Sequence, residues 1–147
     1  MPQTTTDFTI GIPRPKLWSI FSDLKTLGGC VPGCEDVQIV GPDDSRWKVK
    51  LSVGIITKRI DAKAHIAERV EPEKLVVKIE SVDGDITGLW NLQLQEEGSG
   101  ATKVRLIADM RATGSFEWVI NQVIKSQIDK MTRQFADCIT KKSAVGS

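Results

Sequence analysis

The chain has 147 residues, 40% of them hydrophobic and 27% charged, with a formal net charge of +1. This composition predicts a single globular domain spanning residues 1–147 with a sizeable core, and the near-zero charge gives no electrostatic reason to expect a nucleic-acid partner. The first residues lack the basic and apolar regions of a signal peptide, and no apolar run approaches the roughly 20 residues that span a bilayer. We therefore expect a cytoplasmic protein with at most peripheral contact with the inner face of a membrane.

The N-terminal part predicts one strand followed by two short helices. Polar and apolar residues alternate over residues 7–12, as in a half-buried strand. Pro13 and Pro15 end this strand, and Pro15 suits the first turn of a helix. Apolar residues at helical spacing over residues 16–24 predict that helix, and a second short one over residues 24–27 stops at Gly28 and Gly29.

The middle of the chain predicts further strands joined by tight turns. Strand-like patterns occupy residues 35–40, 47–53, 60–67, 75–80, 86–94 and 104–111. Turn-forming residues separate them, for example the Asp83-Gly84-Asp85 segment. Strands joined by such short loops must be antiparallel neighbours, with one polar face and one apolar face that needs a cover.

The cover is expected from the last long stretch, residues 116–139, whose apolar residues recur every three or four positions. No Gly or Pro interrupts it, so it predicts one continuous amphipathic helix, with Gly114 and Ser115 supplying a break and an N-cap before it. Residues 141–147 are expected to form a loose tail. The fold class is therefore α+β: a curved antiparallel sheet of six to seven strands wrapped around a long C-terminal helix, with two short helices after the first strand.

Few residues in the sequence suggest catalysis or metal binding. His65 is the only histidine, and its strand parity places it on the polar face. Cys30 and Cys34 are spaced C-x₃-C without a second Cys/His pair, which leaves a redox or metal role as the minor alternative. Cys138 lies on the helix stripe as a small buried residue, and all three cysteines are expected to be reduced. We therefore expect no metal, no cofactor and no catalytic residue.

The tryptophans differ in their expected positions. Trp90 shares strand parity with Leu92 and should face the helix, as should Trp47. Trp18 and Trp118 fall off the main stripes of their helices. Exposed tryptophans often mark contact surfaces, so these two are candidates for docking another protein.

The segment Leu27-Gly28-Gly29-Cys30-Val31-Pro32-Gly33-Cys34-Glu35 resembles the Pro-Gly-Cys signature of the CoxG family of carbon monoxide dehydrogenase subunits. The opening strand, the helix at 17–23, the strand at 47–54 and Gly114 also resemble the family pattern. The resemblance implies the helix-grip fold of the START/Bet v 1-like SRPBCC superfamily, with an apolar ligand cavity between sheet and helix. It also implies an accessory role beside molybdenum-containing CO dehydrogenases and related hydroxylases.

Three functions remain open from the sequence. The first is binding of an apolar small molecule or lipid, with an isoprenoid quinone as the candidate ligand. The second is an assembly adaptor that docks on CO dehydrogenase-like oxidoreductase subunits without a ligand. The third is an enzyme of the cyclase or hydrolase kind, for which the apolar faces offer almost no acid or base. Strand parity and helical spacing predict the following cavity wall: Leu51, Val53, Ala64, Ile66, Val77, Trp90, Leu92, Leu106, Ala108, Met110, Phe116, Ile120, Val123, Ile124 and Ile128.

Overall fold

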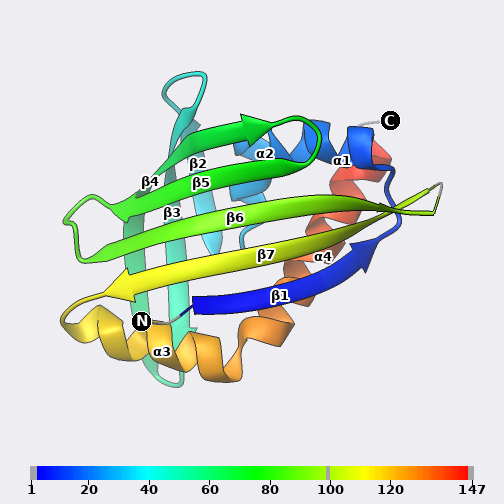
Figure 1. The fold of residues 1–147 in the computed structure, drawn as a ribbon. Coiled ribbons are helices and arrows are strands. Elements are labelled where there is room, and N and C mark those ends of the chain that lie inside the picture. The colour runs from blue at the N-terminus through cyan, green and yellow to red at the C-terminus, as the bar shows by residue number, and fades with distance from the viewer. Residues whose placement is uncertain (1–2, 99, 146–147) are drawn as a thin grey trace.

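A strongly curved antiparallel sheet forms most of the molecule (Figure 1). The computed structural model describes residues 3–98 and 100–145. Its seven strands lie in the order β1-β7-β6-β5-β4-β3-β2, so every neighbour except the β1–β7 pair is also consecutive in sequence. The strands are β1 (Gln3–Ile10), β2 (Cys34–Ile39), β3 (Asp44–Val53), β4 (Ile56–Val70), β5 (Lys74–Ser81), β6 (Ile86–Glu97) and β7 (Ala101–Ala112).

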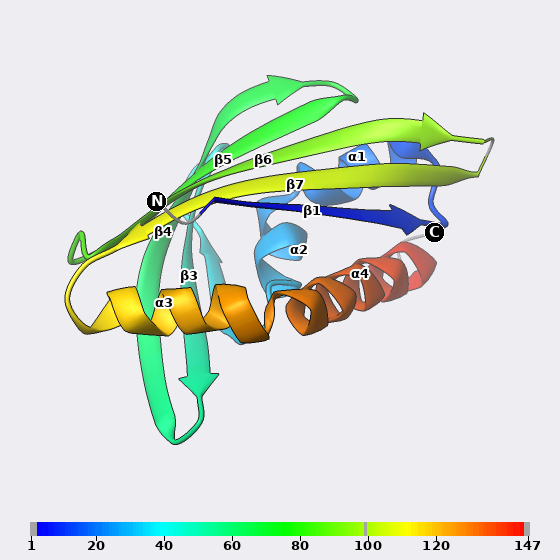
Figure 2. The ribbon, with the colours of Figure 1, turned by 60° about the horizontal axis from the view of Figure 1, so that its bottom comes forward.

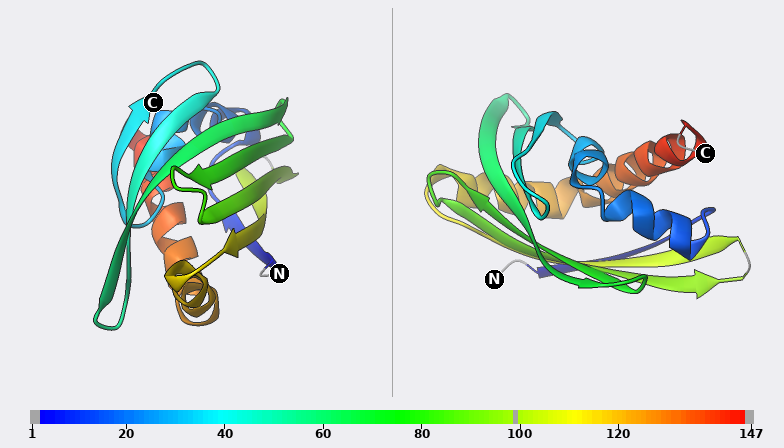
Figure 3. Two further views of the ribbon diagram at one scale, coloured as in Figure 1. Left: turned by 90° about the vertical axis from the view of Figure 1, so that its left-hand side faces the viewer. Right: turned by 90° about the horizontal axis from the view of Figure 1, so that it is seen from above.

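The predicted α+β class and strand pattern are confirmed. The helices are α1 (Arg14–Phe21), α2 (Leu24–Gly29), α3 (Ser115–Ser126) and α4 (Ile128–Val145), and all four lie on the concave side of the sheet (Figures 2 and 3). Strand alternation sets the two faces: Ala62 and Ala64 are buried under the helices, whereas Lys63 and His65 point to solvent. The sheet therefore curves around the helices with its apolar face inward.

The two short helices occupy one end of the concave face. Pro15 lies in the first turn of α1, where the absence of an N–H costs nothing. Asp23 caps α2 by accepting hydrogen bonds from the Lys25 backbone N–H at 3.2 Å and the Thr26 hydroxyl at 2.9 Å. The side chains of Leu17, Phe21, Leu27 and their neighbours are fully buried, so these helices fill that end of the molecule with core.

The expected exposure of Trp18 is wrong. Its side chain is buried, and its indole N–H donates a hydrogen bond of 2.9 Å to the Glu71 carboxylate. Glu71 lies in the turn between β4 and β5, which the curvature of the sheet brings over α1. The sequence could not show this contact, because its partners are 53 residues apart.

The C-terminal helix is long, as predicted, but it is interrupted once. Gln127 leaves helical geometry with φ −127° and separates α3 from α4, although no Gly or Pro lies nearby. Its side-chain amide donates to the Ser52 carbonyl of β3 at 3.2 Å, while its own carbonyl accepts from the Met131 N–H at 2.9 Å. The helix is thus bent where a side chain joins it to the sheet.

Both ends of this helical segment also differ from expectation. Gly114, with φ +63°, is the N-cap residue, and Ser115 already belongs to α3. Helix α4 continues through Val145, so residues 141–145 are not a loose tail. Residues 146 and 147 lie outside the described part of the chain.

A disulfide bond joins Cys30 to Cys138, which corrects the expectation of reduced thiols. The two residues are 108 positions apart in sequence, and their Cα atoms are 5.4 Å apart. The bond connects the C-cap of α2 to the middle of α4. Cys138 is therefore a cross-link and not a simple apolar residue, whereas Cys34 is a free cysteine.

Candidate functional site

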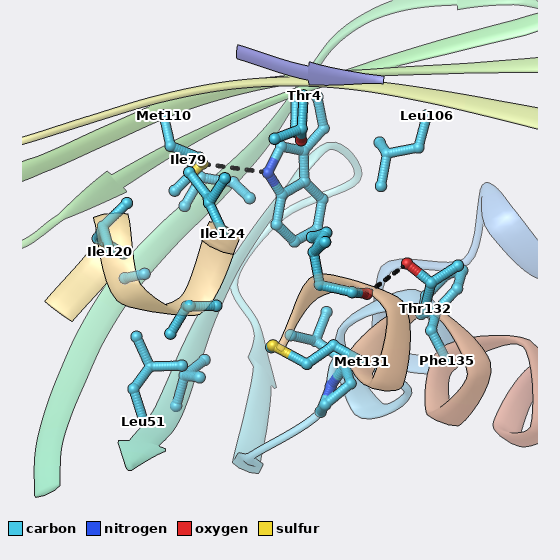
Figure 4. Close-up of a pocket in the computed structure, with 18 of the residues that line it drawn as sticks. Thr4, Leu51, Ile79, Leu106, Met110, Ile120, Ile124, Met131, Thr132 and Phe135 are labelled. Atoms are coloured by element: carbon cyan, nitrogen blue, oxygen red, sulfur yellow. Dashed lines mark hydrogen bonds between the residues drawn. The ribbon is translucent and has the colours of Figure 1, made fainter. Parts of the chain in front are cut away.

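An apolar cavity of about 200 Å³ lies between the concave face of the sheet and helices α3 and α4 (Figure 4). Strands β1, β3, β4, β5, β6 and β7 contribute to its wall, together with α2 and the segment that follows it. The short helices α1 and α2 fill the rest of the concave face, so the cavity is confined to the part under α3 and the start of α4.

The structure brings most of the predicted wall residues together around this cavity. Their strand parity or helical spacing points them inward, and they lie at the correct distance along each element. They are Leu51, Trp90, Leu92, Leu106, Ala108, Met110, Ile120, Val123, Ile124 and Ile128.

The other predicted residues lie elsewhere. Ala64, Ile66 and Val77 face inward but belong to the solid core beneath α1 and α2. Val53 lies near the end of the β3–β4 hairpin, and Phe116 packs beside the same hairpin, with the Lys58 ammonium 5.6 Å from its ring centroid. Parity predicted the correct face for these strand residues, but it does not show how far along each strand the cavity extends.

Further residues complete the wall. Trp47, Val49, Ile60 and Ala62 share the inward parity of their strands, and Met131 and Phe135 continue the apolar stripe of the last helix, so the pattern could have indicated them. Val31 and Pro32 gave no such signal, because they lie in a loop. The additional wall residues are Thr4, Phe8, Leu27, Val31, Pro32, Trp47, Val49, Ile60, Ala62, Ile79, Ser81, Ile86, Met131, Thr132 and Phe135.

Two tryptophan rings form one side of the cavity. The ring centroids of Trp47 and Trp90 are 5.8 Å apart, with an angle of 47° between the planes. The Trp90 indole N–H donates to the Met110 sulfur at 3.3 Å, which fixes the orientation of the ring (Figure 4). Gly88 leaves room for this arrangement, because a Cβ atom there would collide with the Met110 sulfur. A flat aromatic ligand would therefore meet a preorganised aromatic surface.

The wall offers almost no polar chemistry. Among the described residues, no Asp, Glu, Lys, Arg or His lines the cavity. The hydroxyls of Thr132 and Ser81 already donate to the Ile128 carbonyl at 2.8 Å and the Asp83 carboxylate at 2.7 Å. General acid–base catalysis requires a titratable group within hydrogen-bond reach of the substrate, and this wall supplies none.

Titratable groups outside the cavity have structural explanations. His65 pairs with Asp44 at 2.8 Å on the exposed face. The backbone N–H of Asp85 and the Ser81 hydroxyl lower the pKa of Asp83, as expected for a carboxylate that organises a turn. Burial raises the pKa of the Cys34 thiol, which makes it a weaker nucleophile at neutral pH. Within residues 3–98 and 100–145, no three His, Cys, Asp or Glu side chains gather as a metal site.

The family model for the carbon monoxide dehydrogenase component CoxG matches residues 7–144. The chain belongs to the CoxG family. Proteins of this family are in general accessory rather than catalytic. A search of curated proteins found no match to this CoxG chain. No described helix combines the length and apolar character needed to cross a membrane.

Solved structures confirm the Bet v 1-like fold of this CoxG chain. A conserved protein from Geobacillus kaustophilus is similar with a TM-score of 0.81 at 16% identity, covering 99% of this chain and 97% of its own. A START superfamily protein from Mycobacterium smegmatis gives 0.73 at 9% identity, covering 99% of each chain. The Zhui aromatase/cyclase from Streptomyces gives 0.67 at 10% identity, covering 97% and 93%. The fold thus occurs in enzymes as well.

The Pro-Gly-Cys segment of this CoxG chain has a structural role beside the cavity. Gly33 has φ +85°, and its carbonyl accepts a hydrogen bond of 2.8 Å from the Lys50 N–H of β3. A Cβ atom on Gly33 would collide with the Lys50 carbonyl oxygen. The segment therefore needs glycine for both its left-handed conformation and this close approach, and it holds the adjoining Val31 and Pro32 against the cavity.

Replacing Gly33 with alanine should lower the free energy of unfolding by about 2 kcal/mol or more, because left-handed strain and a backbone clash add together. The matched control is Gly29→Ala, since a Cβ atom there meets nothing within 4 Å and Gly29 has no positive φ. Urea denaturation of both variants measures the difference. Equal stability of the two variants would contradict the loop conformation described.

Proposed function

We propose that this protein binds an apolar small molecule or lipid-like ligand in its cavity, as an accessory factor to a CO dehydrogenase-type molybdenum hydroxylase. The observation that carries the proposal is a wall that is apolar and free of charged side chains among the described residues. Such a surface stabilises a ligand mainly by removing apolar area from water, at roughly 25 cal/mol per Å². The partner enzyme is inferred from the family, whose name refers to carbon monoxide dehydrogenase.

The size and shape of the cavity favour a ring-containing ligand. Apolar protein cavities of about 150 Å³ stay dry and bind benzene. At about 200 Å³, this cavity suits a single flat ring system more closely than a long chain. We propose an isoprenoid quinone whose ring lies against Trp90 and whose tail leaves between β3 and the α3–α4 junction, where Leu51 and Ile128 are only half-buried.

An adaptor without a ligand is the alternative. Trp118 supports it, because 49% of this large side chain is exposed on α3. Catalysis of the cyclase or hydrolase kind is supported only by the fold that this chain shares with such enzymes. We favour binding, since an adaptor needs no apolar cavity and a catalyst needs groups that the described wall does not offer.

Mass spectrometry of an organic extract tests the proposal. The protein is purified from its native host without detergent, and the extract should contain close to one quinone molecule per chain. Lipids in the proportions of the bulk membrane would indicate nonspecific carry-over and would contradict specific binding. A chain that is empty, and that takes up no added 2-methyl-1,4-naphthoquinone in equilibrium dialysis, would establish the adaptor alternative instead.

A further inference from the structure

The β3–β4 hairpin extends beyond the rest of the sheet. Its neighbour β2 pairs with β3 only as far as Val49, and β5 pairs with β4 only from Ala62 onward. Residues 50–60 therefore form a two-stranded ribbon that projects past α3 on the side away from β5, β6 and β7 (Figures 2 and 3). Two-stranded hairpins are only marginally stable in water, so a projecting one needs an explanation.

The tip of this ribbon is apolar. Gly54, with φ +61°, and Ile55 form a two-residue turn between Val53 and Ile56. Gly at the first position fits a type II′ turn, but the second position is usually small or polar. Ile55 is 102% exposed, and Ile56 beside it is 39% exposed. A fully solvated isoleucine at the outermost point contributes nothing to the core.

The ribbon below the tip is basic. Lys50, Lys58 and Arg59 lie within it, and no Asp or Glu occurs between residues 49 and 60. The nearest described acidic partner is Glu35 of β2, which pairs with Arg59 at 3.3 Å with both side chains largely exposed. The ribbon therefore carries positive charge directly behind an apolar tip.

Trp118 lies on the same side of the molecule. Ile120 and Val123 face the cavity, and at 100° per residue Trp118 falls on the opposite face of α3. The ribbon extends past α3 in that direction (Figure 2). Tryptophan is enriched at the boundary between lipid and water, where one part of the ring is apolar and the other is wet.

We propose that the tip, formed by Ile55, Ile56 and Trp118 with Lys50 and Lys58 behind it, docks on an anionic lipid bilayer. Apolar side chains inserted at the headgroup level, together with basic residues that attract anionic lipids, are the features of a peripheral membrane contact. A stable protein interface buries about 800 Å² per partner, more than so narrow a tip can supply. Docking does not require an occupied cavity, although it would bring the wall residues Leu51 and Ile60 of the same hairpin near the lipid.

Sedimentation with lipid vesicles tests this inference. The wild-type protein should partition at least tenfold more strongly onto vesicles containing one third phosphatidylglycerol than onto phosphatidylcholine alone, and high salt should remove the difference. Ile55→Asp should reduce the partitioning about tenfold or more, because it removes the inserted side chain and adds a repelled charge. The matched control is Val40→Asp, since Val40 is 56% exposed at the opposite end of β3.

The assay separates docking from ligand binding. Ile55 is outside the core, so circular dichroism of Ile55→Asp should show an unchanged fold. Equal binding of wild type and Ile55→Asp, equal loss in Val40→Asp, or no binding to either vesicle would overturn the inference. So would a lipid-independent dimer that Ile55→Asp dissociates, because the tip would then be an interface between two copies. An empty cavity would disprove the proposed ligand and leave this result unaffected.

Discussion

Replacing Ala108 with tryptophan is expected to abolish ligand uptake while leaving the fold intact. Ala108 lies in the middle of the cavity wall on β7, directly opposite Trp90 in the β6–β7 register. An indole ring added there would occupy much of a cavity of about 200 Å³. Overpacking typically costs about 1–3 kcal/mol of folding stability, which a domain of this size can tolerate. Equilibrium dialysis against 2-methyl-1,4-naphthoquinone should show binding by wild type and none by the variant.

The control for this experiment is Ala67→Trp. Ala67 is also a strand alanine, but it lies exposed at the bulge of β4, far from the wall residues. Its replacement should leave naphthoquinone binding unchanged. Urea denaturation must show that both variants are folded. Uptake by a folded Ala108→Trp variant would mean that the ligand binds somewhere other than this cavity.

The second large effect is expected from loss of the cross-link between α2 and α4. Replacing Cys138 with serine should lower the free energy of unfolding by about 2–5 kcal/mol, because the Cys30–Cys138 bond restricts an unfolded loop that spans 108 residues. Urea denaturation of wild type in the presence of a reducing agent should reproduce the loss. The control Cys34→Ser should be close to neutral, since Cys34 is free and half-buried.

Thiol titration gives an independent check on the cross-link. Wild-type protein unfolded without reductant should expose one thiol, that of Cys34, out of three cysteines. Three titrating thiols, with a stability that reductant does not change, would show that the bond does not form in solution.

The sequence predicted the elements of the fold better than their junctions. Strand alternation and helical stripes depend on nearest neighbours, so the strands, the two short helices and the amphipathic C-terminal segment could all be recognised. The bend at Gln127 could not, because it depends on a hydrogen bond to Ser52 of β3. Trp18 and Cys138 were misplaced for the same reason, since each is defined by a partner that is distant in sequence.

The candidate site was predictable in direction but not in extent. Parity correctly pointed Trp90, Ala108 and Met110 toward the helix, and all three lie on the cavity wall. It also pointed Ala64 and Val77 inward, but α1 and α2 occupy the space in front of them. Which inward-facing residues meet a ligand depends on where the helices stop filling the curve of the sheet, and that is a property of the packed molecule.

The pairing of the first strand with the last has a consequence for how the protein is made. Strands β2 to β7 join through short turns, so their pairing closes small loops as soon as each strand has left the ribosome. Strand β1 must instead wait for β7, its only strand neighbour in the described sheet, about one hundred residues later. Contacts of such high sequence separation form slowly. We therefore expect the newly synthesised chain to assemble as a six-stranded meander first, with its N-terminal strand the last to dock.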